Sequence, residues 1–301
     1  MGRKVEQLGR RRPASGSPKL GGQWSALIWT LATLMVAPGG AAQAATPGPW
    51  RDGRNPIPWV AREAGQDTLA RWYSSVRYDR ELISSDLPQW VDWSSVYALL
   101  IRDFQAGALG VELAQVERFG YRDRGVTVDG YRTLWNRSYG NLRLRVNPGS
   151  DVLPKADLRL EWFQGLPGGW EPSVSYWRMD FDKDDVDLFG LGLARYVGNW
   201  YLREVTSVSR LAGHSALSFS VNARRFLNPP REYWEVSGGI GQEAVVLGPG
   251  PEVEVRKTRF LRASLQKFLS ARWGYSAATA YNRFEGAPER WGVSLGIISR
   301  F

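Results

Sequence analysis

The last residues of the chain alternate between apolar side chains and small or polar ones. The apolar positions are Trp291, Val293, Leu295 and Ile297, and the sequence ends at Phe301. A period of two predicts a β-strand with one apolar face. By itself this pattern fits two architectures, the closing strand of a soluble β-sandwich and the closing strand of a membrane β-barrel.

Similar runs, separated by turn residues, fill the chain from Trp72 onward. They predict strands at 72–82, 90–104, 108–119, 126–134, 141–147, 156–166, 170–181, 186–197, 200–211, 215–227, 231–243, 257–269, 272–284 and 289–301. Most have the roughly 9–11 residues that a tilted strand needs to cross the hydrocarbon of a membrane. We therefore expect about 14 strands, or 12 if the first run or the short run 141–147 does not cross.

The connections between these runs alternate in length. Tight turns follow the even-numbered runs, as at Gly198-Asn199 and Ser270-Ala271. Longer segments follow several odd-numbered runs, at 83–89, 148–155 and 244–256. Short periplasmic turns and longer external loops are typical of outer-membrane barrels. Both ends of such a barrel lie in the periplasm, so the number of strands is expected to be even.

Charged side chains recur in the middle of the predicted strands, opposite the apolar positions. A soluble sandwich would turn these charges to water, whereas a membrane barrel turns its apolar face to lipid and its polar face to the lumen. Trp residues near strand ends favour the membrane, because Trp gathers at both membrane interfaces; they are Trp72, Trp90, Trp135, Trp170, Trp200, Trp273 and Trp291. The sequence therefore predicts an all-β, transmembrane, antiparallel up-and-down barrel.

The alternation also assigns faces to the predicted barrel. The expected lumen-lining residues are Glu112, Asp129, Tyr131, Arg143, Arg145, Asp157, Arg159, Glu161, Tyr176, Arg178, Asp180, Arg224 and Arg262. The runs 186–197 and 200–211 alternate too poorly for any assignment. We expect the barrel-assembly machinery to recognise the last strand through Trp291, Val293, Leu295, Ile297 and Phe301, because a terminal aromatic residue closes outer-membrane barrels.

The first part of the chain has the pattern of a secretory signal. Residues 1–23 are basic, 24–37 are mostly apolar, and Ala42-Gln43-Ala44 fits the cleavage pattern of small residues. We expect a signal peptide at 1–44, a periplasmic N-terminal tail at 45–71 and the barrel at 72–301. These segments predict export to the outer membrane of a Gram-negative cell.

The net charge changes once the predicted signal peptide is set aside. The whole chain has 39 basic and 30 acidic residues, of which residues 1–44 carry 6 and 1, leaving 33 against 29, or +4. The high pI is therefore no argument for nucleic-acid binding. With no Cys and one His, the sequence predicts neither a disulfide framework nor a transition-metal site, and no cofactor is expected.

The region from Glu117 to Phe181 resembles the YaiO family of outer-membrane β-barrels. The matching residues, which continue beyond it in the same order, are Gly130-Tyr131, Leu166-Pro167-Gly168-Gly169-Trp170-Glu171, Tyr176-Trp177-Arg178-Met179-Asp180-Phe181, Tyr196-Val197-Gly198-Asn199-Trp200 and Ala223-Arg224-Arg225-Phe226-Leu227. The resemblance covers most of 72–301. It implies an outer-membrane barrel of poorly defined function, some of whose relatives resemble partners of envelope polysaccharide synthesis and export. It implies no catalytic residues.

Two functions remain open for a barrel with this lumen. A water-filled channel lined by charges and aromatic rings would pass saccharides or other polar cargo. Alternatively, the charged residues pair with one another and fill a closed lumen, which leaves a structural or docking role. In that case the long external segment 244–256 is the obvious contact surface. Expected partners are outer-membrane lipids, the barrel-assembly machinery and components of polysaccharide synthesis in the periplasm or inner membrane, but no nucleic acid.

A lipid-modifying barrel enzyme is the third alternative, and the sequence argues against it. Such enzymes need a His and a Ser within mutual reach. The chain has one His, His214, and the adjacent Ser215 would point to the opposite side of a strand. The acidic run 182–185 lacks the spacing of a calcium loop, and the glycines at 238–241 lie inside a strand. We therefore expect a barrel without enzymatic activity and without a metal.

Overall fold

The computed structural model describes residues 72–84, 92–104, 106–181, 183–211, 214–228, 231–246 and 253–301. The predicted signal peptide and periplasmic tail lie outside these residues. No helix in the described ranges is long and apolar enough to cross a membrane.

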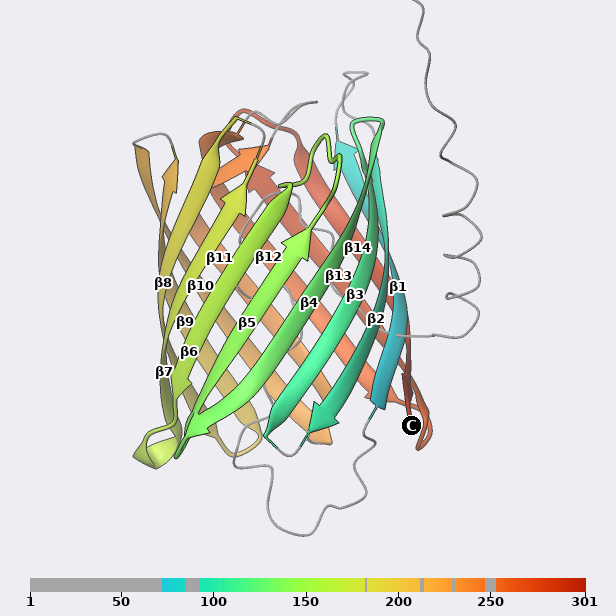
Figure 1. Cartoon of the computed structure of the whole chain (residues 1–301), viewed down its shortest axis with the longest axis vertical. Helices are drawn as coiled ribbons and strands as arrows, with labels where there is room; N and C mark the ends of the chain where they lie inside the picture. Colours follow the sequence, from blue (N-terminus) through green and yellow to red (C-terminus); the bar gives the residue numbers. More distant parts are fainter. Residues whose placement is uncertain are drawn as a thin grey trace, which may run out of the picture. The chain divides into compact units, whose positions relative to one another are not determined.

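The described residues form fourteen antiparallel strands in one closed barrel (Figure 1). In chain order the elements are β1 (Trp72–Ser84), β2 (Trp93–Phe104), β3 (Gly107–Arg118), β4 (Tyr121–Trp135), β5 (Ser138–Val146), β6 (Ala156–Gln164), the short 3-10 turn η2 (Pro167–Gly169), β7 (Trp170–Asp180), β8 (Asp185–Val197), β9 (Trp200–Leu211), β10 (His214–Asn228), β11 (Glu232–Val246), β12 (Val253–Phe268), β13 (Trp273–Phe284) and β14 (Glu289–Arg300). This architecture confirms the prediction of fourteen strands. The short strand β5 pairs with both neighbours along its length, so the twelve-stranded alternative is wrong.

The barrel closes where the first strand meets the last. The Trp72 N–H donates to the Phe301 carbonyl at 3.0 Å, and the Phe301 N–H donates to the Trp72 carbonyl at 3.1 Å. We call this end the lower rim, as it is drawn in Figure 1, and the opposite end the upper rim. Closure pairs both strands that would otherwise be edges, which removes the unpaired backbone groups of an open sheet.

The connections differ partly from the expected alternation of lengths. Lower-rim turns are short, as at Gly198-Asn199. At the upper rim, however, β3 and β4 are joined by only Phe119 and Gly120, whose φ angles of 52° and 80° suit a two-residue hairpin. The predicted loop 244–256 is also too long. β11 extends to Val246 and β12 begins at Val253, because this hairpin pairs from Ala244↔Val255 to Val246↔Val253.

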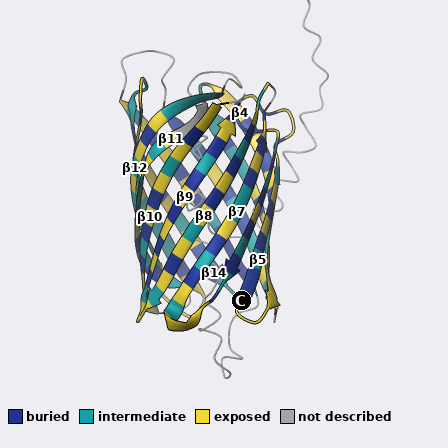
Figure 2. Cartoon of the chain, turned by 90° about the vertical axis from the view of Figure 1, so that its left-hand side faces the viewer, coloured by how far each residue is buried: buried dark blue, intermediate teal, exposed yellow. Residues whose placement is uncertain are grey.

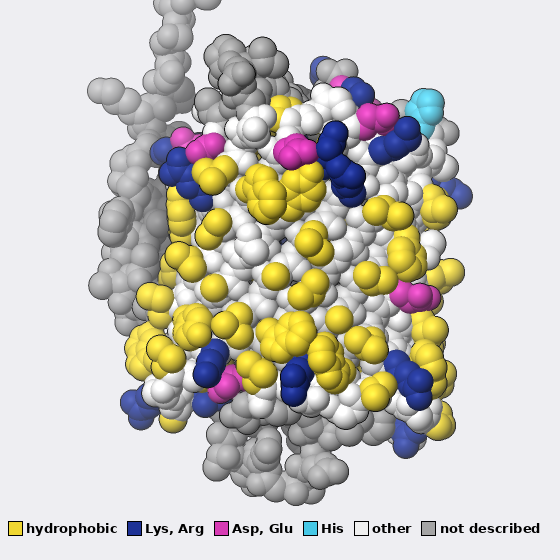
Figure 3. All heavy atoms as spheres, turned by 180° about the vertical axis from the view of Figure 1, so that it is seen from behind, with side chains coloured by type: hydrophobic (Ala, Val, Ile, Leu, Met, Phe, Trp, Pro, Cys, Tyr) yellow, Lys and Arg dark blue, Asp and Glu magenta, His cyan; other side chains and the backbone are white. Residues whose placement is uncertain are grey.

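The faces of the strands alternate around most of the wall, which appears as stripes of buried and exposed residues in Figure 2. In the last strand, Trp291, Val293, Leu295 and Ile297 all point outward and are 53%, 48%, 60% and 56% exposed. On the face seen in Figure 3, hydrophobic side chains are spread over the middle of the outer wall, and Lys and Arg side chains gather toward both rims. An apolar band of this kind suits contact with lipid.

Strands β8 and β9 alternate poorly because both of their faces carry apolar residues near the upper rim. Val186, Leu188 and Leu211 point inward and are buried in a cluster with Trp177 and Met179 of β7. Phe189 and Leu191 point outward on β8 and are exposed. The inward cluster packs against a loop that enters the barrel, as described below.

Candidate functional site

The inner wall of the barrel carries most of the predicted lumen-lining residues. The structure places ten of the thirteen on the inner face: Glu112, Asp129, Tyr131, Arg143, Arg145, Asp157, Arg159, Glu161, Arg224 and Arg262. Seven of these ten are buried; Tyr131, Arg145 and Arg262 are partly exposed. Their part in any transport remains a prediction.

Three of the predicted lumen residues lie on the outer face, and that assignment was wrong. Tyr176, Arg178 and Asp180 share a face of β7 with the exposed Trp170 and Val174. Arg178 forms ion pairs with Asp185 and Asp187, and the Tyr176 hydroxyl donates to Asp187 at 2.7 Å. In this half of β7 the apolar side chains face inward and the polar ones outward, because Trp177, Met179 and Phe181 pack in the apolar cluster inside the barrel.

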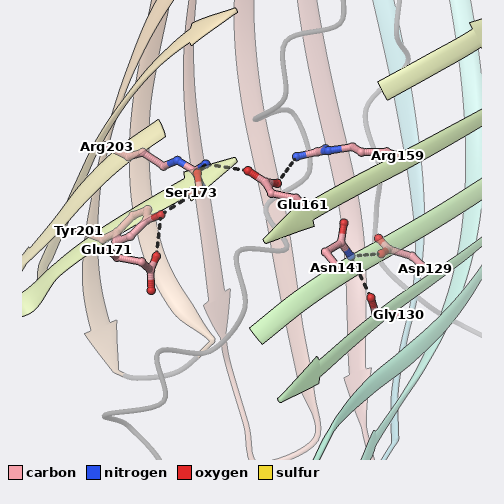
Figure 4. A network of polar contacts seen from close by, with 9 residues as sticks. All are labelled: Asp129, Gly130, Asn141, Arg159, Glu161, Glu171, Ser173, Tyr201 and Arg203. Atoms are coloured by element: carbon pink, nitrogen blue, oxygen red, sulfur yellow. Dashed lines mark hydrogen bonds and ion pairs between the residues drawn. The ribbon is translucent and has the colours of Figure 1, made fainter. Parts of the chain in front are cut away.

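A polar network crosses the inner wall from β6 to β9 (Figure 4). One amino group of the Arg203 guanidinium donates to Glu161 at 2.7 Å and to Ser173 at 2.6 Å. The other oxygen of Glu161 accepts from Arg159 at 2.7 Å. Arg203 and Glu161 have side chains only 2% and 3% exposed, so the pair is buried between strands that are not direct neighbours.

Aromatic side chains border this network on the lower-rim side. The hydroxyls of Tyr196 and Tyr201 both lie 3.5 Å from the same oxygen of Glu171. The Tyr139 ring stacks on Phe163 at a centroid distance of 4.5 Å, and the Arg203 guanidinium lies over Phe163 at 5.0 Å. The network thus offers hydrogen-bond donors, acceptors and ring faces within one region of the wall.

Four residues of this region were not predicted from the sequence: Glu171, Ser173, Tyr201 and Arg203. No faces were assigned to the runs 186–197 and 200–211, so two of these residues were never considered. The alternation of Ser207 and Ser209 with Val208 near the end of β9 is the signal that would have placed Tyr201 and Arg203 on the inner face.

Other inner-face charges are paired in the same way. Arg145 lies 3.1 Å from Asp157, Arg143 lies 3.8 Å from Glu112, and Arg224 donates to Glu235 at 2.7 Å. Because the pairs lie along the wall, opposite charges largely neutralise one another. The inner wall therefore has mixed charge rather than one strong sign.

The loop between β5 and β6, residues 147–155, folds into the barrel below the upper rim. The Asp123 carboxylate on β4 accepts backbone N–H groups from Asp151, Val152 and Leu153 at 2.9, 2.9 and 2.8 Å. Asp123 is 3% exposed, so these charge-assisted bonds are shielded from water. This residue anchors the loop, which we call the inward loop.

Two consecutive residues of the inward loop contact different parts of the wall. Val152 packs in the apolar cluster of β7, β8 and β9, whereas Leu153 packs with Tyr97 of β2 and Val116 of β3. These two groups of strands lie on opposite sides of the barrel in the order of the sheet. The inward loop therefore spans the lumen. The length of this segment predicts an external loop, and that prediction is wrong. The two adjacent apolar residues in a polar, Pro-containing segment were the signal that it turns inward.

At the lower rim, Arg231 reaches across part of the opening. It forms an ion pair with Asp103 of β2, and its guanidinium lies over the Tyr73 ring of β1 at 4.2 Å. Tyr73 packs in turn with Phe268 and Ile298. Contacts between wall segments that are distant in the sheet thus occur near both rims.

Comparison with protein-family models decides the family. The model described as the YaiO membrane beta barrel domain matches residues 73–245, which is more than half of the chain. The chain belongs to this family. As a YaiO-type barrel it lies in the outer membrane, and its lower rim, which holds the short turns and both ends of the barrel, faces the periplasm. The upper rim is external.

Solved structures with the same fold are outer-membrane barrels of low sequence identity. The "CymD monoaromatic hydrocarbon channel" has a TM-score of 0.54 at 8% identity, over 77% of this chain and 89% of that chain. Omp33 of Acinetobacter baumannii has a TM-score of 0.47 at 11% identity, over 77% and 99%. An anion-selective porin of Comamonas acidovorans has a TM-score of 0.42 at 8% identity, over 76% and 98%. A comparison with curated protein sequences gives no significant match.

Among the described residues considered for catalysis or metal binding, His214 and Asp185 lie at the external rim of this YaiO-type barrel. His214 is the exposed first residue of β10. Asp185 shares the Arg178 guanidinium with Asp187 on the outer face. Within the described ranges no group of three or more acidic or His side chains could hold a metal ion.

Proposed function

We propose that this YaiO-type barrel is a porin-like passage for saccharides or other polar, largely uncharged cargo, narrowed by the inward loop. The observation that supports this proposal is the polar network of Glu161, Glu171 and Arg203 beneath that loop. The barrel acts without catalysis, in contact with outer-membrane lipids. We propose that polysaccharide synthesis components supply its cargo.

The chemistry of the inner wall favours hydroxyl-rich cargo. Arg203 and Glu161 neutralise each other, so the wall would not concentrate ions of one sign strongly. Tyr196 is partly exposed beside the buried Tyr201 and Glu171, and sugars bind to phenol groups through hydrogen bonds and ring stacking.

A closed barrel with a structural or docking role is the second candidate. It is favoured by the inward loop, whose Val152 and Leu153 pack on opposite walls. The Arg231–Asp103 pair adds a second crossing contact at the periplasmic rim. On this alternative the buried charges only stabilise the barrel.

Conductance measurements separate the two candidates. The wild-type barrel, a variant with residues 149–153 replaced by a short Gly-Ser turn, and Asp185→Asn as an exposed outer-face control are inserted into planar bilayers. The passage predicts channel events in the wild type, larger events in the inward-loop variant, and unchanged events in the control. Maltooligosaccharides should reduce the current in proportion to their occupancy of the lumen.

If neither the wild type nor the inward-loop variant conducts, the passage proposal fails and the closed barrel stands. Conductance of equal size in both would show that the inward loop does not narrow the lumen.

A further inference from the structure

An apolar groove lies on the outer face of the barrel, over strands β10 to β13. Its volume is about 460 Å³, and its lining includes Val221, Gly238, Ile240, Leu261 and Tyr281. The groove exists because Gly238 has no side chain where its neighbours on the outer face have large apolar ones. The volume lies within the range of about 300–1,000 Å³ that is usual for ligand sites.

A guanidinium lies at the external end of this groove. β12 runs from the external rim to the periplasmic rim, and Arg259 precedes Leu261 on the same outward face. In register it is opposite Ile240 on one side and Arg283 on the other. Arg259 is exposed, and Tyr281 beside it packs on Trp291 at a centroid distance of 4.9 Å. Aromatic pairs of this kind mark the membrane interface.

Arg259 lacks the acidic partner that several other cations of the external half of the outer wall have. Arg283 pairs with Glu289 at 2.9 Å, Lys257 with Glu285 at 3.2 Å, and Arg80 with Asp92 at 2.8 Å. Among the residues that the structure describes, no acidic side chain pairs with Arg259. An ionised side chain that faces lipid is unfavourable without a counter-charge, so an anion from outside the chain is the expected partner.

From these observations we infer that the groove binds the phosphorylated glycolipid of the external leaflet. Acyl chains would lie over Gly238 between Val221, Ile240 and Leu261, and a phosphate would accept hydrogen bonds from Arg259. The site lies on the lipid-facing wall, so it does not depend on the proposed passage.

The position of the groove favours this glycolipid over a phospholipid of the inner leaflet. The cation is at the external end, so its phosphate partner belongs to the external leaflet. The groove extends over four strands, or roughly 14 Å at a strand spacing of about 4.8 Å. A volume of about 460 Å³ encloses roughly one acyl chain, and the other chains would lie against the outer wall beside it.

The test uses the complete barrel purified in detergent, with lipid A as the probe and phosphatidylglycerol as the competitor, and counts bound lipid by native mass spectrometry. The wild type should retain one lipid A. Arg259→Gln should weaken lipid A binding about tenfold, because one charge-assisted hydrogen bond is lost. Gly238→Leu should weaken it as well, because its side chain would fill the groove; an added Cβ lies 3.3 Å from the Phe260 carbonyl oxygen, a tight contact that requires a small shift of the neighbouring strand.

Two matched variants control for general effects on the outer wall. Arg225→Gln removes an outward cation at the periplasmic end, where it lies over Trp200 at 5.8 Å. Gly130→Leu adds a side chain at an outward glycine outside the groove. Both should bind lipid A like the wild type. Equal binding by wild type and Arg259→Gln, absence of lipid A from the wild type, or equal retention of phosphatidylglycerol would each overturn the inference.

Discussion

The Asp123 carboxylate accepts the backbone N–H of Val152 at 2.9 Å, and this bond joins strand β4 to a loop that crosses the lumen. The same carboxylate accepts from both neighbours of Val152. A polar anchor on the wall and an apolar contact at Val152 therefore act together. Without the anchor, three backbone donors inside the barrel would need other partners.

Replacing Asp123 with Ala should release the inward loop. A buried donor left unpaired costs about 1–3 kcal/mol, so we expect the free energy of unfolding to fall by at least about 2 kcal/mol. Urea unfolding in detergent micelles, followed by Trp fluorescence, measures this change. Asp151→Ala is the control, because Asp151 is exposed in the same loop. Equal effects of the two substitutions would show that Asp123 is not the anchor.

Substituting Arg203 with Met should destabilise the barrel strongly, because Glu161 would lose a buried counter-charge. Breaking a buried ion pair costs about 3–5 kcal/mol, and we expect the lower end because Arg159 still donates to Glu161. The temperature at which the folded band disappears in a heat-modifiability gel reports the change. Arg225→Met on the outer face should leave this temperature nearly unchanged, and a similar loss there would contradict the assignment.

The Asp92 carboxyl should report the contact between β1 and the start of β2. The hydrogen bond from Arg80 lowers the pKa of Asp92 below its usual value. Because folding lowers the pKa of Asp92, the contact stabilises the fold at pH values above the pKa that Asp92 has in the unfolded chain. This stabilisation is lost as the pH falls through the lowered value. In Arg80→Gln, an NMR titration should show the pKa of Asp92 rising toward about 3.9; an unchanged midpoint would refute the pairing.

Gly239 should not tolerate a side chain. A Cβ there would lie 2.5 Å from the Phe260 ring and 2.8 Å from the Phe219 carbonyl. Overpacking of this kind costs about 1–3 kcal/mol, so Gly239→Ala should lower the urea midpoint. Gly130→Ala is the matched control, because the nearest atom to its Cβ would be at 3.6 Å. Equal stability of the two variants would contradict the close packing of Phe260 and Phe219 around Gly239.

Strand number, closure and most of the faces were predictable from the sequence because they depend on local pattern. In β5 and β6, each outward Leu alternates with an inward charge, and the two-residue period needs no knowledge of distant residues. The same holds for Trp291 to Ile297 in the last strand. Ten predicted lumen residues could therefore be placed on the inner face without a structure.

Which side chains fill the lumen depends on the tertiary structure alone. Trp177 and Met179 point inward, and Arg178 outward, because the Val152 side chain reaches their half of the barrel from a loop between other strands. Similarly, Arg203 meets Glu161 only after the sheet has curved enough to bring β9 toward β6. The sequence determined the barrel and its lipid-facing surface because alternation is a property of neighbouring residues. The contacts inside the barrel depend on which side chains are brought together when the sheet closes. The spacing of residues along the chain does not determine these contacts.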